Sequence, residues 1–575
     1  MARRIPALAQ ASQSVSDWSA HYRADMAAWG LGRKLAKRPF HTAKADTIRG
    51  SARIGADRVD GKFERFGQQI DTQGSNLWNQ ALPSERFAEW LHGFEWLYDI
   101  HAVGSAESRN AARQYVDSWV EAYGDYHSFA WHPSVLSRRL LALGLCWSPT
   151  LNTDSLSDLA LKRRECSLKQ ARYLKRTRKL IKPGYEQIEA DIALSVMSVR
   201  DDAATIPDNI VARLDDSLSD QILPDGGHVS RSPEVGLKVF ASLVALDTLL
   251  EARGLPAPPA VSRAIDRLGP TLAFFSHTDG GLATFHGSGE GDPRTRAAAM
   301  ARSVSKPFAF APHSGYQRLA CGNTVVLMDV AAPAPFPMDS DAHVSPLAFE
   351  MSVAEGRLIV SCAFSPEQPL SWKQAVRRIS AHSALDIVGA SASQFAEPRR
   401  GFTDPVRHIR RDSSPITANR REAEPGVVVE GSHEGYTSSA GLIHRRRVFL
   451  AQSGADVRGE DDLVVTDEGR AQLSKDDDVA IRFHLHPDVK ASLAPEGSHI
   501  RLDIGDARWV FLANAPGLRF CLEASAYLGA GSRPVPTQQI VLSGKVEESI
   551  GAPIRWALRK APSSSSLKEQ EDKRA

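Results

Sequence analysis

The 575-residue sequence has little cysteine, little net charge and no long hydrophobic run. Its five cysteines are scattered, odd in number and never spaced as CxxC, which argues against a disulfide scaffold. Lysine and arginine number 70 against 68 acidic residues, so no overall field favours nucleic acid as a partner. No stretch approaches the roughly 18 apolar residues of a spanning helix, so we expect no transmembrane segment.

Common catalytic motifs are missing as well. The sequence contains no GxSxG, no HExxH and no GxxxxGK[ST], so serine hydrolases, zincins and P-loop enzymes are not indicated. The N-terminus is basic but has no apolar segment typical of a signal peptide. The glycine-rich segment 287–291 does not open a βαβ unit, and we expect a flexible interdomain loop there.

The sequence contains enough apolar residues to form large hydrophobic cores, since 42% of its residues are hydrophobic. Between about residues 80 and 280 the apolar residues recur at helical spacing. The pattern predicts amphipathic helices that stack as antiparallel pairs, at 87–98, 112–123, 135–145, 188–199, 210–223, 235–252 and 261–275.

After about residue 305 the apolar runs become short, β-branched and alternating, which is typical of antiparallel strands. Examples lie at 324–330, 349–361, 427–430, 479–486, 500–504, 509–513 and 539–543. Because the predicted helices all precede the predicted strands along the chain, we expect an α+β multidomain protein. We expect an extension at 1–44, a helical domain at 45–300, an antiparallel β domain at 301–560 and a disordered tail at 561–575.

One polar segment lies where a helix is expected to begin. His228 and Arg231 precede Ser232, Pro233 and Glu234, which suit an N-cap, the first helical position and the first turn. The two basic side chains would project from the loop at the helix start, where they could act on a ligand. An ordinary capped helix entry with incidental polar residues explains the segment equally well.

A second set of polar residues lies near predicted strand ends. Asp341 and His343 precede the strand at residue 349, and His382 precedes the strand at 384. With Cys362 these histidines form a ligand set that zinc accepts. A surface loop and a satisfied edge histidine are the alternatives. His484 and His486 share one face of a strand, as two ligands or as part of a half-exposed surface.

These segments, in this order, resemble the heparinase II/III-like family of polysaccharide lyases. The matching residues lie at 131–134, 137–139, 224–228, 231–233, 314–316, 343, 349–350, 381–383 and 443–446. The resemblance implies an incomplete (α/α) toroid followed by a large antiparallel β-sandwich, with a polysaccharide groove at their junction. It also implies an acidic polysaccharide as partner and an exported protein, which the N-terminus does not indicate.

The family reaction is β-elimination on a uronic acid, which needs a neutralised carboxylate, a base and an acid. Given this resemblance, we expect catalytic roles for His228, Arg231 and Asp341, with His228 as base or acid and Arg231 holding the uronate carboxylate. It implies no required cofactor, with zinc as an option. The remaining assignments are substrate binding by Glu234 and Tyr316, and metal binding by His343, Cys362 and His382.

The sequence departs from the family pattern at several of these places. Val235 and Gly236 stand where active lyases carry Tyr-His, and Asp341 replaces the first histidine of a His-x-His pair. The family's metal-site aspartate is replaced around residues 361–362. Tyr316 or Tyr436 could supply the tyrosine. Otherwise the chain is a non-catalytic glycan-binding or envelope-biogenesis protein, or an inverting hydrolase with Glu234 and Asp341 as its carboxylates.

Overall fold

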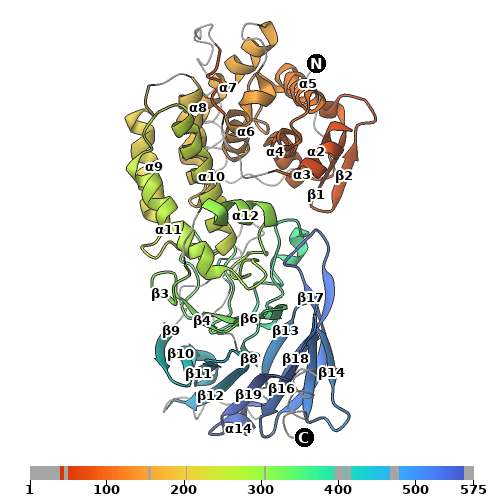
Figure 1. Ribbon diagram of the computed structural model, residues 1–575, viewed down its shortest axis with the longest axis vertical. Coiled ribbons are helices and arrows are strands. Elements are labelled where there is room, and N and C mark those ends of the chain that lie inside the picture. Colours follow the sequence, from red (N-terminus) through yellow and green to blue (C-terminus); the bar gives the residue numbers. More distant parts are fainter. Residues whose placement is uncertain are drawn as a thin grey trace, which may run out of the picture.

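A helical region and a β region follow one another along the chain in the computed structural model (Figure 1). The structure describes residues 39–44, 50–152, 157–201, 204–302, 306–390, 416–466 and 478–562, and the single residues 392, 395, 408 and 409. Most of the predicted N-terminal extension and C-terminal tail lies outside these residues. The first described stretch is packed: Phe40 is buried, and its ring lies 4.6 Å from that of Trp147.

The helical region contains the predicted helices and others that periodicity did not indicate. Serine N-caps at Ser84, Ser105 and Ser157 begin three of the helices, and prolines occupy the first position of three more. A short hairpin of β1 (Lys62–Arg65) and β2 (Gln68–Asp71) lies beside them. The helices are α2 (Ala52–Val59), α3 (Glu85–His92), α4 (Trp96–Val103), α5 (Ala106–Tyr123), α6 (Pro133–Leu145), α7 (Asp158–Thr177), α8 (Tyr185–Arg200), α9 (Asp208–Gln221), α10 (Pro233–Ala252), α11 (Pro259–Phe275) and α12 (Pro293–Arg302).

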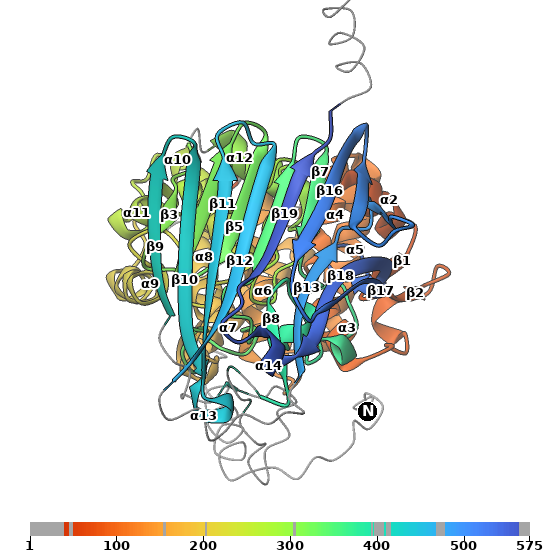
Figure 2. The ribbon, with the colours of Figure 1, turned by 90° about the horizontal axis from the view of Figure 1, so that it is seen from below.

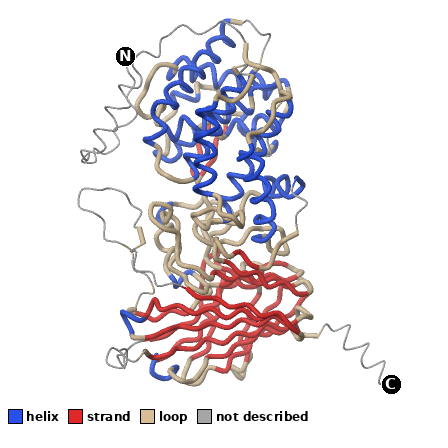
Figure 3. The backbone as a smooth tube through the Cα atoms, turned by 90° about the vertical axis from the view of Figure 1, so that its left-hand side faces the viewer, coloured by secondary structure: helices blue, strands red, loops and turns tan. Residues whose placement is uncertain are grey.

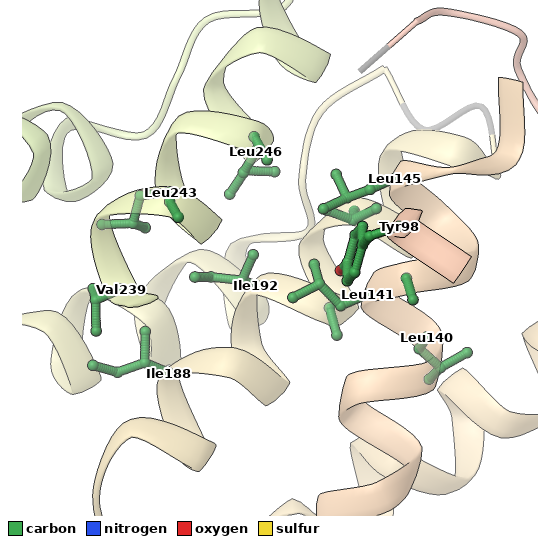
Figure 4. Close-up of a cluster of buried hydrophobic side chains, with 14 of the residues drawn as sticks. Tyr98, Leu140, Leu141, Leu145, Ile188, Ile192, Val239, Leu243 and Leu246 are labelled. Atoms are coloured by element: carbon green, nitrogen blue, oxygen red, sulfur yellow. The ribbon is translucent and has the colours of Figure 1, made fainter. Parts of the chain in front are cut away.

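Helices α6, α8 and α10 pack in succession through their apolar faces. Leu141 of α6, Ile192 of α8 and Leu243 of α10 are buried in one continuous core, which Figure 4 shows in close-up. Each such side chain contributes about 1.5–3 kcal/mol by leaving water. The helices curve into the incomplete toroid that the resemblance implied.

Two predictions of helices need correction. The helix expected over 87–98 is two helices, α3 and α4, because the chain turns at Phe94, whose φ is +57°. Helix α7 was not predicted, because polar side chains such as Arg163, Arg164 and Gln170 are buried on it and interrupt the apolar spacing. Apolar periodicity is weak in a helix whose buried face is partly polar.

The β region is an antiparallel sandwich of two large sheets. One sheet has the order β17 (Arg519–Tyr527), β18 (Val535–Lys545), β13 (Asp478–Leu485), β7 (Gly356–Val360), β6 (Phe349–Val353), β5 (Thr324–Asp329), β4 (Tyr316–Cys321) and β3 (Phe310–Ala311), and β8 (Leu385–Val388) also pairs with β13. The other has the order β14 (Lys490–Leu493), β15 (His499–Ile504), β16 (Ala507–Asn514), β19 (Ile554–Lys560), β12 (Asp456–Val465), β11 (Leu442–Ala451), β10 (Gly426–Tyr436) and β9 (Ile416–Ala423).

Aromatic side chains join the two sheets, which lie one behind the other in Figure 2. Phe349 of one sheet stacks on Trp556 of the other with ring centroids 5.2 Å apart. Phe483 and Phe511 meet edge to face, with ring centroids 4.8 Å apart. These contacts fill the space between the sheets with large apolar surfaces, which is how an aligned sandwich builds its core.

A layer of loops connects the helices to the sandwich (Figure 3). The glycine-rich segment 287–291, predicted as a flexible loop, is ordered in this layer: Ser288 is fully buried and bonds to Ser232. Helix α12 begins at Pro293, directly after this segment. Among the described residues, no helix has the length and apolar character needed to span a bilayer.

Candidate functional site at the junction of the two regions

Most of the predicted site residues lie in the loop layer, and the structure brings several of them together. Arg231, on the loop before α10, reaches strands β4 and β5 and has a left-handed backbone with φ of +62°. Its Nε donates to the Ser314 carbonyl at 2.8 Å. Its remaining donors bond to Asp329 and to the carbonyls of residues 315, 331 and 332.

Arg231 is therefore fully engaged within the protein. Burial opposes its charge, but the Asp329 carboxylate raises the pKa of Arg231 above the usual value. The same pair lowers the pKa of Asp329, although burial alone would raise it. A substrate carboxylate could bind this guanidinium only by displacing Asp329 or a backbone carbonyl. Arg231 therefore has no free donor with which to hold a uronate carboxylate, the role predicted for it.

Tyr316, predicted to bind substrate, supports Arg231 from the other side. Its hydroxyl donates to the Arg231 carbonyl at 2.7 Å, and its ring lies 4.7 Å from the guanidinium carbon. The side chain is fully buried, and burial raises its pKa well above the usual value. In this position Tyr316 holds the loop in place and cannot exchange a proton with a ligand in solvent.

His228 is also enclosed. Its Nδ1 accepts from the backbone N–H of Ser230 at 3.1 Å, and its Nε2 donates to Gln221 at 3.1 Å. The side chain is 3% exposed, and burial lowers its pKa to about 3. His228 is therefore neutral at physiological pH, with both ring nitrogens occupied.

Asp225, three residues before His228, lies in the segment 224–228 that matched the family, although no role was predicted for it. Its carboxylate accepts from the backbone N–H groups of His313 and Ser314 at 2.7 and 2.8 Å. Position 227 requires glycine, because a methyl group there would lie 2.4 Å from Ser314 Cβ. We call the set Asp225, Arg231, Ser314, Tyr316 and Asp329 the motif contact; it fastens the helical region to the sandwich.

Glu234 lies in the first turn of α10, as predicted, and is directed into the protein. Its Oε2 accepts from the backbone N–H of Gly289 at 2.9 Å, and its Oε1 pairs with Lys238 at 3.1 Å. The Ser288 hydroxyl bonds to the Glu234 backbone N–H and so takes the place of a cap. Glu234 therefore anchors the glycine-rich segment to the helix start.

Asp341 is the most open of the predicted residues, with a side chain 44% exposed. Its carboxylate pairs with Lys373 at 2.6 Å and accepts from Ser340. Burial tends to raise its pKa, but the Lys373 ammonium holds the pKa below the usual range. As an ionised carboxylate with a cationic partner, Asp341 is suited to binding and poorly suited to donating a proton.

Three histidines form a buried stack two residues from Asp341 in sequence, at His343. The ring of His343 lies 4.4 Å from that of His382 and 5.3 Å from that of His286, which the sequence analysis did not single out. His286 Nδ1 accepts from the His343 backbone N–H, so its Nε2 carries the proton and donates to Asp329 at 3.0 Å. The stack therefore continues the hydrogen bonds of the motif contact.

The predicted zinc ligands do not assemble. Both ring nitrogens of His343 face backbone N–H groups, at 3.1 and 2.9 Å, and His382 donates Nε2 to the Val376 carbonyl. Cys362 lies instead beside His484, with 3.6 Å between Sγ and Nδ1, and burial raises the pKa of its thiol to about 11. No group of three His, Cys, Asp or Glu side chains in the described part of the chain could hold a metal ion. These residues do not fit zinc.

The remaining candidates are structural. Tyr436 is fully buried, and its hydroxyl donates to the Leu385 carbonyl at 3.0 Å. Val235 and Gly236, at the family's Tyr-His position, lie in the first turn of α10 and carry no group that transfers protons. His286 and Asp329 were missed because each is a single polar residue without a spacing pattern. Asp225 lay in a matching segment, but no role was predicted for it. Only the fold brings them together.

The comparisons agree with this architecture. The model of the heparinase II/III-like C-terminal family matches residues 303–563. FtsZ-localized protein C of Caulobacter vibrioides is 34% identical over 541 residues, covering 92% of this chain and 90% of that protein. A crystal structure of heparinase III has a TM-score of 0.64 at 12% identity, covering 96% of this chain and 90% of that one.

A second solved structure, heparan sulfate lyase HepC of Pedobacter heparinus in a mutant form, has a TM-score of 0.56 at 12% identity. It covers 94% of this chain and 88% of that one. At such identity these structures establish the shared toroid-plus-sandwich fold. With the family model and the full-length relative, they show that the chain belongs to the heparinase II/III-like family.

Proposed function

We propose that this chain is a non-catalytic member of its family, which binds a glycan on the lyase scaffold and acts where FtsZ assembles. One observation carries the proposal: Arg231 and Tyr316 are buried and hydrogen-bonded inside the motif contact, and His228 is buried beside it with both ring nitrogens engaged. Of the residues that resemble catalytic groups, Arg231 and Tyr316 hold the two regions together, and His228 fixes the loop before α10.

Elimination needs an accessible base beside C5 of a uronic acid and donors for its carboxylate. His228 has a pKa of about 3 and no open face, and Arg231 has no unused donor. Val235 and Gly236 replace the tyrosine and histidine that the resemblance implies for an active lyase. The chain therefore keeps the scaffold without a competent set of proton-transfer groups.

Glycan binding is supported by exposed groups near the junction. Trp372 is 38% exposed, and its neighbour Lys373 pairs with the open carboxylate of Asp341. A partly exposed aromatic ring beside polar groups is suited to stacking on a sugar face. The Caulobacter relative is named for localisation with FtsZ, and its identity over nearly the whole chain supports the same location here.

A second candidate is the lyase activity itself, on a uronic acid-containing acidic polysaccharide. The fold favours it, since the heparinase III and heparan sulfate lyase structures align over at least 94% of the chain. Such an enzyme would need the motif contact to open, so that His228 and Arg231 reach the substrate.

An elimination assay separates the two candidates. The purified chain is incubated with heparin, heparan sulfate, chondroitin sulfate, alginate and envelope polysaccharide, with and without zinc. Formation of the C4–C5 double bond is followed by ultraviolet absorbance. We expect no increase on any substrate; an increase that His228→Ala abolishes would establish the lyase and overturn the proposal.

Binding is measured in parallel on the same polysaccharides. We expect Trp372→Ala to weaken binding about fivefold, because one stacking contact contributes on the order of 1 kcal/mol. Phe310→Ala is the matched control, since Phe310 is 45% exposed on strand β3.

The location is tested separately. A fluorescent fusion of this chain is expressed in Caulobacter vibrioides cells that lack their own FtsZ-localized protein C. A diffuse signal away from FtsZ would contradict that part of the proposal.

A further inference from the structure

The outer face of the eight-stranded sheet, which Figure 2 shows from below, carries many arginines. Side chains along β11, β12 and β19 alternate between buried and more exposed positions, so every second residue points away from the sandwich core. On these strands and on β9, six of the outward residues are exposed arginines. We call them the arginine face: Arg421, Arg445, Arg447, Arg458, Arg555 and Arg559.

The carboxylates between these arginines are too few to neutralise them. Four such carboxylates point outward, at Glu430, Asp456, Glu460 and Asp462. Glu460 is shared by Arg447 and Arg555, at 3.1 and 2.8 Å, and Asp456 is shared by two further arginines of the face. Six cations against four anions leave an excess of two positive charges on this part of the sheet.

The positive charge is also the outermost charge. The four arginines in ion pairs have side chains 47–59% exposed, whereas the carboxylates that hold them are 20–38% exposed. Arg421 and Arg445 form no ion pair with any residue that the structure describes. Exposed ion pairs contribute little to stability, so the sandwich itself does not account for this excess of arginine.

The arginines recur at a regular interval along the strand direction. Strands β11, β12 and β19 pair so that their outward residues form rows across the sheet, and successive rows are two residues apart. Four successive rows contain Arg445, Arg447, Arg458 and Arg559. Two residues of an antiparallel strand span about 6.8 Å, so a cation recurs at about this interval across the face.

The geometry points to a docking surface for an extended segment of a partner protein with acidic side chains at alternate positions. Side chains on one face of an extended chain are also about 6.8 Å apart, so each carboxylate can meet one row of the arginine face. Guanidinium groups bind carboxylates through two parallel hydrogen bonds. Duplex DNA has a phosphate at about half this interval on each strand, and its charges would also meet the intervening carboxylates. The surface is independent of the proposed glycan function.

Two isomeric peptides test the surface on the native chain. One alternates glutamate with threonine, and the other carries all its glutamates before its threonines, so that charge and composition are equal. We expect the alternating peptide to bind about fivefold more tightly at low salt, because it forms about two more exposed ion pairs. Equal affinity for the two isomers, or no binding of either, would overturn the proposal.

Two double variants locate the binding. Arg421→Gln with Arg445→Gln should weaken binding of the alternating peptide about fivefold, and it leaves no carboxylate of the face without an ion-pair partner. Lys175→Gln with Lys179→Gln is the matched control, since it removes two exposed cations at the end of α7 and just after it. An equal loss in both variants would mean that the peptide binds through general surface charge, and would overturn the proposal.

Other polyanions test the class of partner. Binding of phosphatidylglycerol vesicles, duplex DNA and heparin is measured on the native chain and on the variant that lacks Arg421 and Arg445. We expect this variant to lose more affinity for the alternating peptide than for any of the three polyanions. A larger loss for one of them would assign the arginine face to that class of ligand, and would overturn the proposal.

Discussion

The two regions touch at two kinds of contact that differ sharply in burial. The motif contact is enclosed, with Arg231 and Asp329 side chains only 6% and 3% exposed. On the other side, hairpin β1–β2 and α3 meet the loop at 366–368 through Arg65, Arg86 and Glu367, which we call the hairpin contact. Its Arg65–Glu367 pair is 2.9 Å long, and its side chains are 35% and 27% exposed.

The same chemistry, an arginine paired with a carboxylate, therefore serves two different purposes. At the motif contact the charges are out of water, so removing one partner leaves the other unpaired in a medium of low dielectric. At the hairpin contact water screens the pair and replaces either partner at little cost. The helical region should be fixed at the motif contact and only loosely tied at the hairpin contact.

The largest expected effect comes from breaking the motif contact. Asp329→Ala removes the carboxylate that Arg231 and His286 share, leaving a buried guanidinium without its counter-charge. We expect the free energy of unfolding to fall by about 3–5 kcal/mol. Chemical denaturation followed by tryptophan fluorescence measures this change.

The matched control is Glu367→Ala at the hairpin contact. It removes one carboxylate from an arginine in the same way, but at an exposed pair. A loss as large as that of Asp329→Ala would contradict the difference between the two contacts. A loss of under about 1 kcal/mol for Asp329→Ala would show that Arg231 readily finds other partners.

Most of the fold could be predicted from the sequence, because apolar periodicity is a local signal. Helices α6, α8 and α10 and strands β5 and β13 lie within a few residues of their predicted ranges. The apolar pattern missed α7, where several buried side chains are polar. It also predicted one helix where a positive φ at Phe94 separates α3 from α4. Neither a buried arginine nor a left-handed residue alters apolar spacing.

The site could be predicted only as a set of motifs. The sequence indicated that Arg231 and Tyr316 matter, but they become buried and paired only because β4 and β5 meet a loop about 90 residues away along the chain. The carbonyls that occupy Arg231 belong to the backbone and leave no trace in residue types. For the same reason the sequence could not distinguish a structural contact from a catalytic one.

An intermediate effect is expected from acidification. His228 has a folded pKa of about 3, far below the value near 6.5 that an unfolded histidine has. Below about pH 6.5 the unfolded chain therefore binds a proton that the folded chain does not, and stability decreases as the pH falls towards 3. At pH 5 this one group should cost about 2 kcal/mol relative to pH 7.

The His228→Gln variant isolates this contribution. Glutamine does not titrate, so the difference in stability between the variant and the native chain should shrink as the pH falls from 7 to 5. Denaturation midpoints at the two pH values measure it. An unchanged difference would mean that His228 is protonated in the folded chain, which would also reopen its role as a catalytic acid.

The smallest expected effect is at the hairpin contact. Glu367→Gln keeps the shape and the hydrogen-bonding oxygen that faces the Phe66 backbone N–H, and removes only the charge opposite Arg65. Because the pair is partly exposed, its loss should cost under about 1 kcal/mol, and the cost should disappear in high salt. Arg86 still donates to the Gln368 carbonyl, so the loop stays docked. Thermal unfolding of the native and variant chains at low and high salt measures the size of the loss and its salt dependence. A loss above about 1 kcal/mol that does not change with salt would mean that the hairpin contact resembles the buried motif contact.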